Sequence, residues 1–520
     1  MGGLWLTALT FAPLLGAFAV LMQTEDRAIW RSAFVFSLIP LLISLYLFAI
    51  FDPHDGGYQF VEAYRWIPQF GISYHLGMDG ISLFLVILTA ILISLSVLYS
   101  GGGDIEMRPR EFCFFILMLE TGLLGALLAV DLFLFYVFWE VMLVPMYFLI
   151  GIWGHGRKIY ATFKFVLFTM LGSLLMLVAM LYLVGAARAH LGYLTFDLPQ
   201  LYRVPLTRTE ARWLFAGFAI AFAIKVPMWP VHTWLPDAHT EAPTAGSVIL
   251  AGVMLKMGTY GFLRFAIPLF PEAAIEATPL FMALAVIGII YGALVAMVQP
   301  DLKRLVAYSS VSHLGFVMLG IFALDPQGVE GAIYQMLNHG LSTGGLFLLV
   351  GMIYLRRHTR EISEFGGLWK SVPVYSAVFM VVMLSSIGLP GLNGFVGEFL
   401  ILLGAFLGTA WWWFAVIAVA GIVLGALYML YAYERVMWGP ITKAANQSLP
   451  DLDRREVAVM VPLILLMVLM GLYPRPLLSR IEPSVATLLG RVHAAEARDN
   501  GSPRETPVGL QLATHWRSGR

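Results

Sequence analysis

The sequence predicts an all-α integral membrane protein with about 14 transmembrane helices. Hydrophobic residues make up 59% of the 520 residues and charged residues only 12%, whereas charged residues are about a quarter of a typical soluble domain. Apolar runs of roughly 18 to 25 residues recur from the start of the chain to about position 475, and each can cross a hydrocarbon core about 30 Å thick. Two of these runs are overlong and contain prolines near their middles, which predicts two broken helices.

The apolar runs follow one another with no room for a soluble domain between them. We divide the chain into three N-terminal helices (1–111), two five-helix units (112–270 and 271–440), a last transmembrane helix (441–487) and a polar tail (488–520) that we expect to be poorly ordered. The spans are expected near residues 4–22, 29–51, 79–99, 112–130, 132–153, 161–185, 212–238, 244–269, 278–298, 302–323, 329–355, 373–405, 411–437 and 456–473.

Prolines mark the two broken spans. Pro227 and Pro230 lie in the seventh span, and Pro390 lies in the twelfth. Because a break that faced lipid would leave backbone polar groups unsatisfied, both breaks must face protein or water. Each broken span is the fourth of its five-helix unit, and an odd number of helices per copy puts the copies in opposite orientations. The layout therefore predicts two inverted repeats, a transporter pattern, although the halves share no strong residue identity.

Lysines and arginines in the short loops set the expected orientation. Most of them fall on one side of the predicted bundle, among them Arg157, Lys158, Lys303, Arg356 and Arg357. That side is cytoplasmic by the positive-inside rule. Both termini are then expected on the periplasmic side of a bacterial inner membrane.

Four ionisable side chains stand inside apolar spans. Glu140 lies in the fifth span, Lys225 directly precedes the break in the seventh, Lys256 is central in the eighth, and Glu398 follows the break in the twelfth. A charge at the bilayer centre costs about 2.5 to 3.5 kcal/mol on insertion scales, so four cost on the order of 10 kcal/mol without compensation. We interpret them as a chain of proton carriers in a hydrated interior. The alternative is that each pairs with a neighbouring helix and only fastens the bundle.

Two histidines extend the predicted chain of carriers. His313 in the tenth span and His339 in the eleventh suit proton relay because the pKa of imidazole is near neutrality, although a lone interior histidine is often only a hydrogen-bonding group. Moving Glu140 toward or away from Lys225 would load or release a proton on the lysine. Glu120, in the fourth span, is also out of place. It can carry protons, pair locally or face an adjoining subunit.

Composition and motifs argue against several other classes of protein. The single cysteine, Cys113, rules out a disulfide framework, a four-thiolate iron–sulfur site and a cysteine-based zinc site. The formal net charge is zero, which gives no sign of a nucleic-acid partner. The run from His232 to Glu241 contains two histidines and two carboxylates, but its prolines favour the polar end of a broken helix over a metal site. No cofactor or metal is expected in this chain.

Several segments resemble one known family. KVPMWPVHTWLPDAHTEAPTAGS (residues 225–247) and LKMGTYG (residues 255–261) are similar to the signature of the antiporter-like membrane subunits of NADH:quinone oxidoreductase, respiratory complex I. The resemblance covers roughly spans three to thirteen. It includes Phe138-Trp139-Glu140, Ser312-His313-Leu314-Gly315, Asn338-His339-Gly340, Leu389-Pro390-Gly391 and Gly397-Glu398-Phe399.

The resemblance implies a role for each buried charge. Glu140 would partner Lys225, Lys256 would connect the two halves, and Glu398 would be the terminal acid. The sister chains L and N usually carry lysine at that last position, so Glu398 favours the M type, the counterpart of mitochondrial chain 4. The resemblance also implies that NADH, FMN, iron–sulfur clusters and quinone belong to partner subunits. The expected neighbours are chains L and N, a peripheral redox arm and the lipid bilayer.

Two other functions stay open on the sequence. A cation/proton antiporter or a membrane-bound hydrogenase subunit of the same superfamily would share this helical unit with its Glu and Lys residues. A scaffold that conducts nothing is the second alternative. It predicts that removing Lys225 affects assembly and pumping equally.

Overall fold

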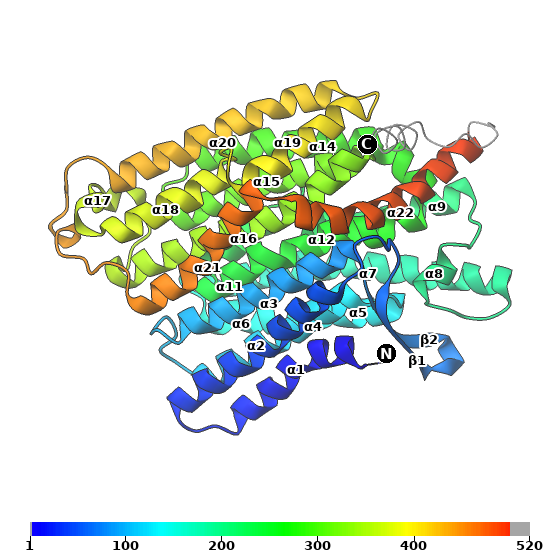
Figure 1. Ribbon diagram of the computed structural model, residues 1–520, viewed down its shortest axis with the longest axis horizontal. Helices are drawn as coiled ribbons and strands as arrows, with labels where there is room; N and C mark the ends of the chain where they lie inside the picture. The colour runs from blue at the N-terminus through cyan, green and yellow to red at the C-terminus, as the bar shows by residue number, and fades with distance from the viewer. Residues whose placement is uncertain (1–2, 500–520) are drawn as a thin grey trace, which may run out of the picture.

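The apolar runs form helices that lie side by side in a bundle, with a short β-hairpin at one end (Figure 1). The computed structural model describes residues 3–499. The strands are β1 (Gln59–Ile67) and β2 (Ile72–Met78). The helices are α1 (Trp5–Leu21), α2 (Asp26–Ile50), α3 (Gly80–Ser100), α4 (Pro109–Leu128), α5 (Leu132–Val141), α6 (Leu143–Trp153), α7 (Lys158–Leu191), α8 (Leu198–Leu201), α9 (Arg208–Lys225), α10 (Trp234–Glu241), α11 (Thr244–Ile249), α12 (Leu255–Gly261), α13 (Ile267–Leu269), α14 (Pro271–Met297), α15 (Leu302–Phe322), α16 (Pro326–Arg357), α17 (Leu368–Ser371), α18 (Pro373–Ser386), α19 (Asn393–Leu407), α20 (Trp413–Met437), α21 (Arg454–Leu472) and α22 (Arg475–Asp499).

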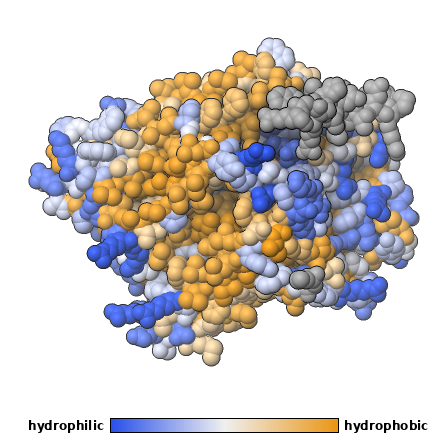
Figure 2. All heavy atoms as spheres, in the orientation of Figure 1, coloured by the Kyte–Doolittle hydropathy of each residue, from blue (hydrophilic) through white to orange (hydrophobic). Residues whose placement is uncertain are grey.

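The surface of the bundle is that of a membrane protein. On the face shown in Figure 2, apolar side chains cover the middle of the bundle and polar side chains gather toward both ends. Within residues 3–499, eleven helical spans are long and apolar enough to cross a membrane. The seventh and twelfth expected spans are not among them because each is divided in two, and α1 has only 17 residues. The prediction of a predominantly helical, multi-pass fold is confirmed, while the number fourteen stays a prediction.

Both predicted helix breaks are present. Helix α9 ends at Lys225 and α10 begins at Trp234, so Pro227 and Pro230 lie in the connection. Helix α18 ends at Ser386 and α19 begins at Asn393. Between α18 and α19 the backbone passes through positive φ at Gly388 (75°) and Gly391 (96°), a conformation that residues with a Cβ rarely adopt.

The fifth span has an interruption of its own. Helix α5 ends at Val141 and α6 begins at Leu143. Pro145 has no backbone N–H to donate to the carbonyl four residues earlier, that of Val141, which explains a disturbed turn at this point. Glu140 is therefore in the last turn of α5 rather than within an unbroken helix.

The most buried helices form the centre of the bundle. An 18-residue stretch of the span Thr244–Leu269 is 100% buried inside the protein, as is such a stretch of α16, whereas only 28% of the corresponding stretch of α2 is buried. The first of these spans joins α11, α12 and α13 through two π-helical turns, Leu250–Met254 and Phe262–Ala266. The spans that carry Lys256 and His339 are thus shielded from lipid by the helices around them.

Two elements at one end of the bundle differ from the sequence-based expectation. The β-hairpin was not predicted, and its Glu62 carboxylate accepts hydrogen bonds from the backbone N–H groups of Leu6 (2.7 Å) and Thr7 (3.1 Å) at the start of α1. The tail from residue 488 was expected to be poorly ordered, but residues 488–499 belong to α22. This helix buries Ile481, Val485 and other apolar side chains, which is why it is ordered; the rest of the expected tail lies outside the described residues.

Gly258 controls the contact between α12 and α9. A Cβ at this position would lie 2.7 Å from the carbonyl oxygen of Phe222 and 2.8 Å from the backbone nitrogen of Val226. We expect Gly258→Ala to cost about 1–3 kcal/mol of stability because backbone atoms must move. Gly185→Ala is the matched control, since a Cβ there meets nothing within 4 Å. Thermal unfolding of the purified complex tests this: equal midpoints for the two variants would contradict a close approach of α9 and α12.

Candidate functional site

Lys256 and His339 form the centre of the buried polar site. The Lys256 Nζ atom lies 2.6 Å from Nδ1 of His339, on α16, and donates a second hydrogen bond of 2.5 Å to the carbonyl oxygen of Ala251. The two residues are 1% and 2% exposed, so the bulk solvent does not reach them. Nε2 of His339 is buried and has no hydrogen-bond partner among the residues that the structure describes. The ring can therefore accept a proton on one side and present the other nitrogen to the interior.

A π-helical turn directly before Lys256 makes its geometry possible. Residues Leu250–Met254 have the wider π-helical winding, which changes which backbone groups are bonded within the helix. The carbonyl group of Ala251 lies inside this turn, where the side chain of Lys256, five residues later, can reach it. Such turns occur frequently at functional sites, and here the turn aims the ammonium group at α16.

The line of polar side chains continues from His339 to Glu398. The imidazole ring of His313, on α15, has its centre 5.9 Å from that of His339. Its Nδ1 atom lies 3.1 Å from Oε1 of Glu398, in α19. Both His313 and Glu398 are buried. Four of the six predicted site residues, Lys256, His339, His313 and Glu398, are thus brought together in one line.

Neighbouring polar residues hold the far end of this line. Gln335 donates a hydrogen bond of 3.0 Å to Oε1 of Glu398 and accepts one of 2.9 Å from Nδ2 of Asn338. The same Asn338 atom also donates to the carbonyl oxygen of Asn393, at the start of α19. The hydroxyl of Tyr428, on α20, is 3.5 Å from His313 Nε2. Sequence reasoning did not assign these three side chains to the site, because single polar residues in an apolar run are common. Only Asn338 carried a signal, since it stands in the motif Asn338-His339-Gly340.

Glu140 and Lys225 form a second cluster. Lys225, the last residue of α9, is 2% exposed, and its Nζ atom lies 5.1 Å from the ring centre of Trp139 and 5.7 Å from that of Phe165. The Glu140 carboxylate acts on Lys225 electrostatically rather than through a direct ion pair. Its Oε1 atom is buried and has no hydrogen-bond partner within the described residues. The two charges are neighbours on one cluster of helices, as the proton-switch hypothesis requires.

A third polar cluster contains His239, Lys303, Asp104 and Thr244. His239, in α10, is fully buried, and neither of its ring nitrogens has a hydrogen-bond partner in the described part of the chain. It lies in the electrostatic fields of Lys256 and of Lys303 at the start of α15. The Thr244 hydroxyl donates to the Asp104 carboxylate at 3.1 Å, and burial raises the pKa of Asp104 to about 6. The sequence singled out His239 only within a metal-like run and did not identify Asp104 or Lys303 as site residues.

Glu120 stands apart from these clusters, whereas the run from His232 to Glu241 contributes His239 to the third of them. Glu120 is fully buried, and neither of its carboxylate oxygens has a hydrogen-bond partner among residues 3–499. The run from His232 to Glu241 forms the connection before α10 and α10 itself, where Asp237 pairs with Lys164 at 2.7 Å. Within residues 3–499, no group of three or more His, Cys, Asp or Glu side chains is arranged to hold a metal ion.

Two helices broken at prolines and a line of buried ionisable groups define a membrane protein of the transporter class. The family model described as NADH:quinone oxidoreductase/Mrp antiporter, TM matches residues 129–425. NADH-quinone oxidoreductase subunit M of Rhodobacter capsulatus is 46% identical over 502 residues, covering 94% of this chain and 97% of that protein. NADH-ubiquinone oxidoreductase chain 4 of Marchantia polymorpha is 42% identical over 492 residues, covering 93% and 97%.

A solved structure agrees with these relatives. A chain of respiratory complex I from Thermus thermophilus with bound NADH superposes with a TM-score of 0.85 and 34% identity, covering 94% of this chain and 99% of that one. The chain therefore belongs to the NADH:quinone oxidoreductase/Mrp antiporter family of multi-pass membrane proteins, as its sequence motifs predicted.

Proposed function

We propose that this chain is the M-type subunit of a NADH:quinone oxidoreductase and that it moves protons across the membrane through Glu140, Lys225, Lys256, His339, His313 and Glu398. The relatives named subunit M and chain 4 align with nearly the whole chain. Electron transfer from NADH to quinone takes place in partner subunits, which hold FMN, the iron–sulfur clusters and quinone. This chain is a translocase without redox chemistry of its own.

The contact between Lys256 and His339 is the observation that carries the proposal. A distance of 2.6 Å between Nζ and Nδ1 is within reach of direct proton transfer. From His339 the proton passes to His313, across a ring separation of 5.9 Å that requires a bridging water or movement of a ring. His313 then delivers it to Glu398, 3.1 Å away.

The Glu140–Lys225 cluster is the switch in this mechanism. A carboxylate near Lys225 favours the charged ammonium, and its withdrawal favours release of the proton. Lys225 ends α9 directly before the proline break, so a small movement of the break changes its distance from Glu140. Each elementary charge moved against 100 mV needs about 2.3 kcal/mol, which the redox reaction in the partner subunits supplies.

The proposal includes an arrangement in the membrane. The two five-helix units, residues 112–270 and 271–440, are inverted repeats, preceded by the helices of residues 1–111 and followed by the last transmembrane helix within 441–487. The loops rich in arginine and lysine face the cytoplasm of a bacterium, so the end that bears the β-hairpin and α22 is periplasmic, as are both termini. The antiporter-like chains L and N are the membrane neighbours.

Substitution of Glu140 or Lys225 by alanine tests the switch. We expect proton pumping by the assembled complex to fall about tenfold, because the electrostatic coupling between two such sites is typically 1–3 kcal/mol. The measurement compares dye-detected acidification with NADH:quinone electron transfer in membranes in which the amount of assembled complex has been determined.

Lys164→Ala is the matched control, because Lys164 pairs with Asp237 at the edge of the same group of helices. Normal pumping by assembled Glu140→Ala and Lys225→Ala complexes would show that the buried charges are structural. A cation other than the proton would be indicated if pumping depended on sodium or potassium rather than on pH.

A further inference from the structure

One face of α16 leads from the centre of the buried site toward the end of the bundle that carries the arginine- and lysine-rich loops. Every fourth residue from the contact with Lys256 onward belongs to this face: His339, Thr343, Phe347 and Gly351. Side chains at this spacing lie on the same side of a helix. The helix rises roughly 18 Å from the first to the last of them, at 1.5 Å per residue.

Buried polar groups without protein partners line this face. The Thr343 hydroxyl, the Tyr99 hydroxyl and both ring nitrogens of His239 have no hydrogen-bond partner among residues 3–499. The His239 ring is stacked on that of Phe347, with 4.8 Å between the ring centres and 13° between the ring planes. Buried polar groups in proteins are nearly always hydrogen-bonded, to water where the protein offers no partner. These groups therefore mark a path for water along α16.

The outer end of this path has a close contact between hydroxyl groups and a small polar cavity. A Cβ on Gly351 would lie 2.6 Å from Oγ1 of Thr244 and 2.7 Å from the Tyr99 hydroxyl, so a side chain there would push into both. The cavity beside them has a volume of about 10 Å³ and is lined by Gly351, Thr244 and Lys303, among others. This is about the smallest volume that holds one water molecule.

Asp104 is the acidic group at this outer end. It lies in the loop between α3 and α4, where its Oδ1 atom accepts the hydrogen bond from Thr244. Its Oδ2 atom is buried and has no hydrogen-bond partner within the described part of the chain. Burial raises the pKa of Asp104 to about 6, and a carboxyl group with a pKa close to neutral both binds and releases protons readily.

His239 connects the outer and inner ends of the path electrostatically. It lies in the fields of Lys303 on the outer side and Lys256 on the inner side, and it acts in turn on His339. Because like charges disfavour each other, a proton on His239 favours the loss of a proton from Lys256. The group that receives this proton is His339, 2.6 Å from the lysine. Protonation of His239 therefore drives the first transfer of the proposed relay.

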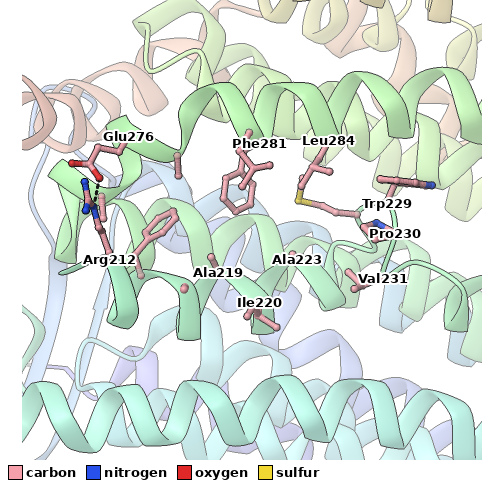
Figure 3. A pocket seen from close by; sticks show the side chains of 16 residues that line it. Arg212, Ala219, Ile220, Ala223, Trp229, Pro230, Val231, Glu276, Phe281 and Leu284 are labelled. Atoms are coloured by element: carbon pink, nitrogen blue, oxygen red, sulfur yellow. Dashed lines mark hydrogen bonds and ion pairs between the residues drawn. The ribbon is translucent and has the colours of Figure 1, made fainter. Parts of the chain in front are cut away.

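A larger groove between α9 and α14 offers no comparable route. Its volume is about 470 Å³. Arg212 and Glu276 form an ion pair at one end of the groove, and Trp229 and Pro230 line the other end (Figure 3). The side chains that line the groove between these two ends are apolar. They give a proton no group to bind, so protons do not follow this groove into the bundle.

We propose that Asp104 and His239 form the proton uptake route of this chain, with water along α16 between them. One proton passes from water on the cytoplasmic side to the Asp104 carboxylate and then through water to the His239 imidazole. Lys256 gives its own proton to His339 and, once neutral, takes the proton from His239. This inference rests on the proposed proton translocation and adds two carriers to the six residues named there.

Inside-out membrane vesicles test the route, because their outer face is the cytoplasmic one. The measurements are NADH:quinone electron transfer and the formation of membrane potential, followed with a potential-sensitive dye, each per assembled complex. We expect His239→Gln to slow both rates roughly 100-fold, as is typical when a positioned proton-transfer group is lost. Asp104→Asn keeps an acceptor for Thr244 but binds no proton. It should slow both rates about tenfold, less than the usual effect, because water still reaches the path.

Formate separates proton transfer by Asp104 from a structural role. Asp104→Ala leaves space for a small carboxylate at the outer end of the path, so added formate should raise both rates of this variant toward those of the unchanged protein. Formic acid crosses membranes without carrying net charge and therefore does not discharge the membrane potential. Lys256→Met should not respond to formate, because its defect lies further inside.

Two variants control for general effects of the substitutions. His232→Gln is matched to His239→Gln, since His232 is also buried, at 3% exposure, but lies in the field of Lys164 instead. Glu106→Gln changes an exposed carboxylate in the same loop as Asp104. Both controls should leave electron transfer and membrane potential unchanged.

Normal rates in assembled His239→Gln and Asp104→Asn complexes, beside a loss in Lys256→Met, would overturn the uptake route while the proposed proton path stands. Normal rates in Lys256→Met would instead refute that path, and the uptake route with it. If His239→Gln does not assemble, the Asp104 variants decide. Normal rates in Asp104→Asn, or a slow Asp104→Ala complex that formate does not accelerate, would leave Asp104 with a structural role and overturn the route.

Discussion

Lys256→Arg is expected to stop coupled proton pumping although it keeps a positive charge at the centre of the site. Lys256 donates to Ala251 and contacts His339 at 2.6 Å, and proton transfer requires that the ammonium group can lose a proton. Arginine stays protonated in proteins. We expect pumping to fall about 100-fold or more, the contribution typical of a positioned proton-transfer group.

The measurement is acidification per assembled complex with NADH as electron donor, beside the rate of quinone reduction. Lys256→Met should give the same loss, and Lys370→Arg, at an exposed position, should give none. A fixed charge that only fastens helices would tolerate arginine. Normal pumping by an assembled Lys256→Arg complex would therefore remove Lys256 from the proton path.

Arg264→Met is expected to cost about 3–5 kcal/mol of stability, because it leaves a buried carboxylate without its partner. The guanidinium of Arg264 contacts Asp79 Oδ1 at 2.5 Å, the hydroxyl of Tyr260 at 3.1 Å and that of Tyr58 at 3.2 Å. The side chains of Arg264 and Asp79 are only 9% and 5% exposed. The loss should appear as a lower midpoint of thermal unfolding and as less assembled complex.

An exposed pair at the same end of the bundle supplies the comparison. Arg212→Gln breaks the ion pair between Arg212 and Glu276, whose side chains are 56% and 27% exposed. We expect this substitution to cost at most about 1 kcal/mol of stability. Adding Asp79→Asn to Arg264→Met should recover most of the loss, since the unpaired charge is removed while an acceptor for the N-terminus of α3 is kept. If Arg264→Met costs no more than Arg212→Gln, the buried pair is not stabilising.

Much of this protein follows from local properties of its sequence. Hydropathy locates the spans, prolines locate the breaks at residues 226–233 and 387–392, and the cost of burying charge identifies Glu140, Lys225, Lys256 and Glu398. Each of these inferences depends on a residue and its near neighbours in the chain. That is why they hold without knowledge of which helices touch.

The sequence named the histidines of the predicted proton relay but not the side chains that they contact. The sequence placed His313 and His339 in separate spans and left open whether either was more than an interior hydrogen-bonding residue. The structure places His339 against Lys256, 83 positions earlier in the chain, and His313 against Glu398, 85 positions later. It also adds Gln335 and Tyr428, which no sequence pattern had separated from ordinary core residues, and His239, which the sequence had singled out only within a metal-like run.

The sequence by itself determined that the chain lies in a membrane, where two of its helices break at prolines, and that Lys225, Lys256 and Glu398 are buried. Only the tertiary structure decided which buried groups meet, that a π-helical turn aims Lys256 at α16, and that residues 59–78 and 488–499 are ordered. The physical reason is that hydropathy records the transfer of a side chain out of water and carries no information about its neighbour. That neighbour depends on the rotation and packing of helices that are far apart in sequence.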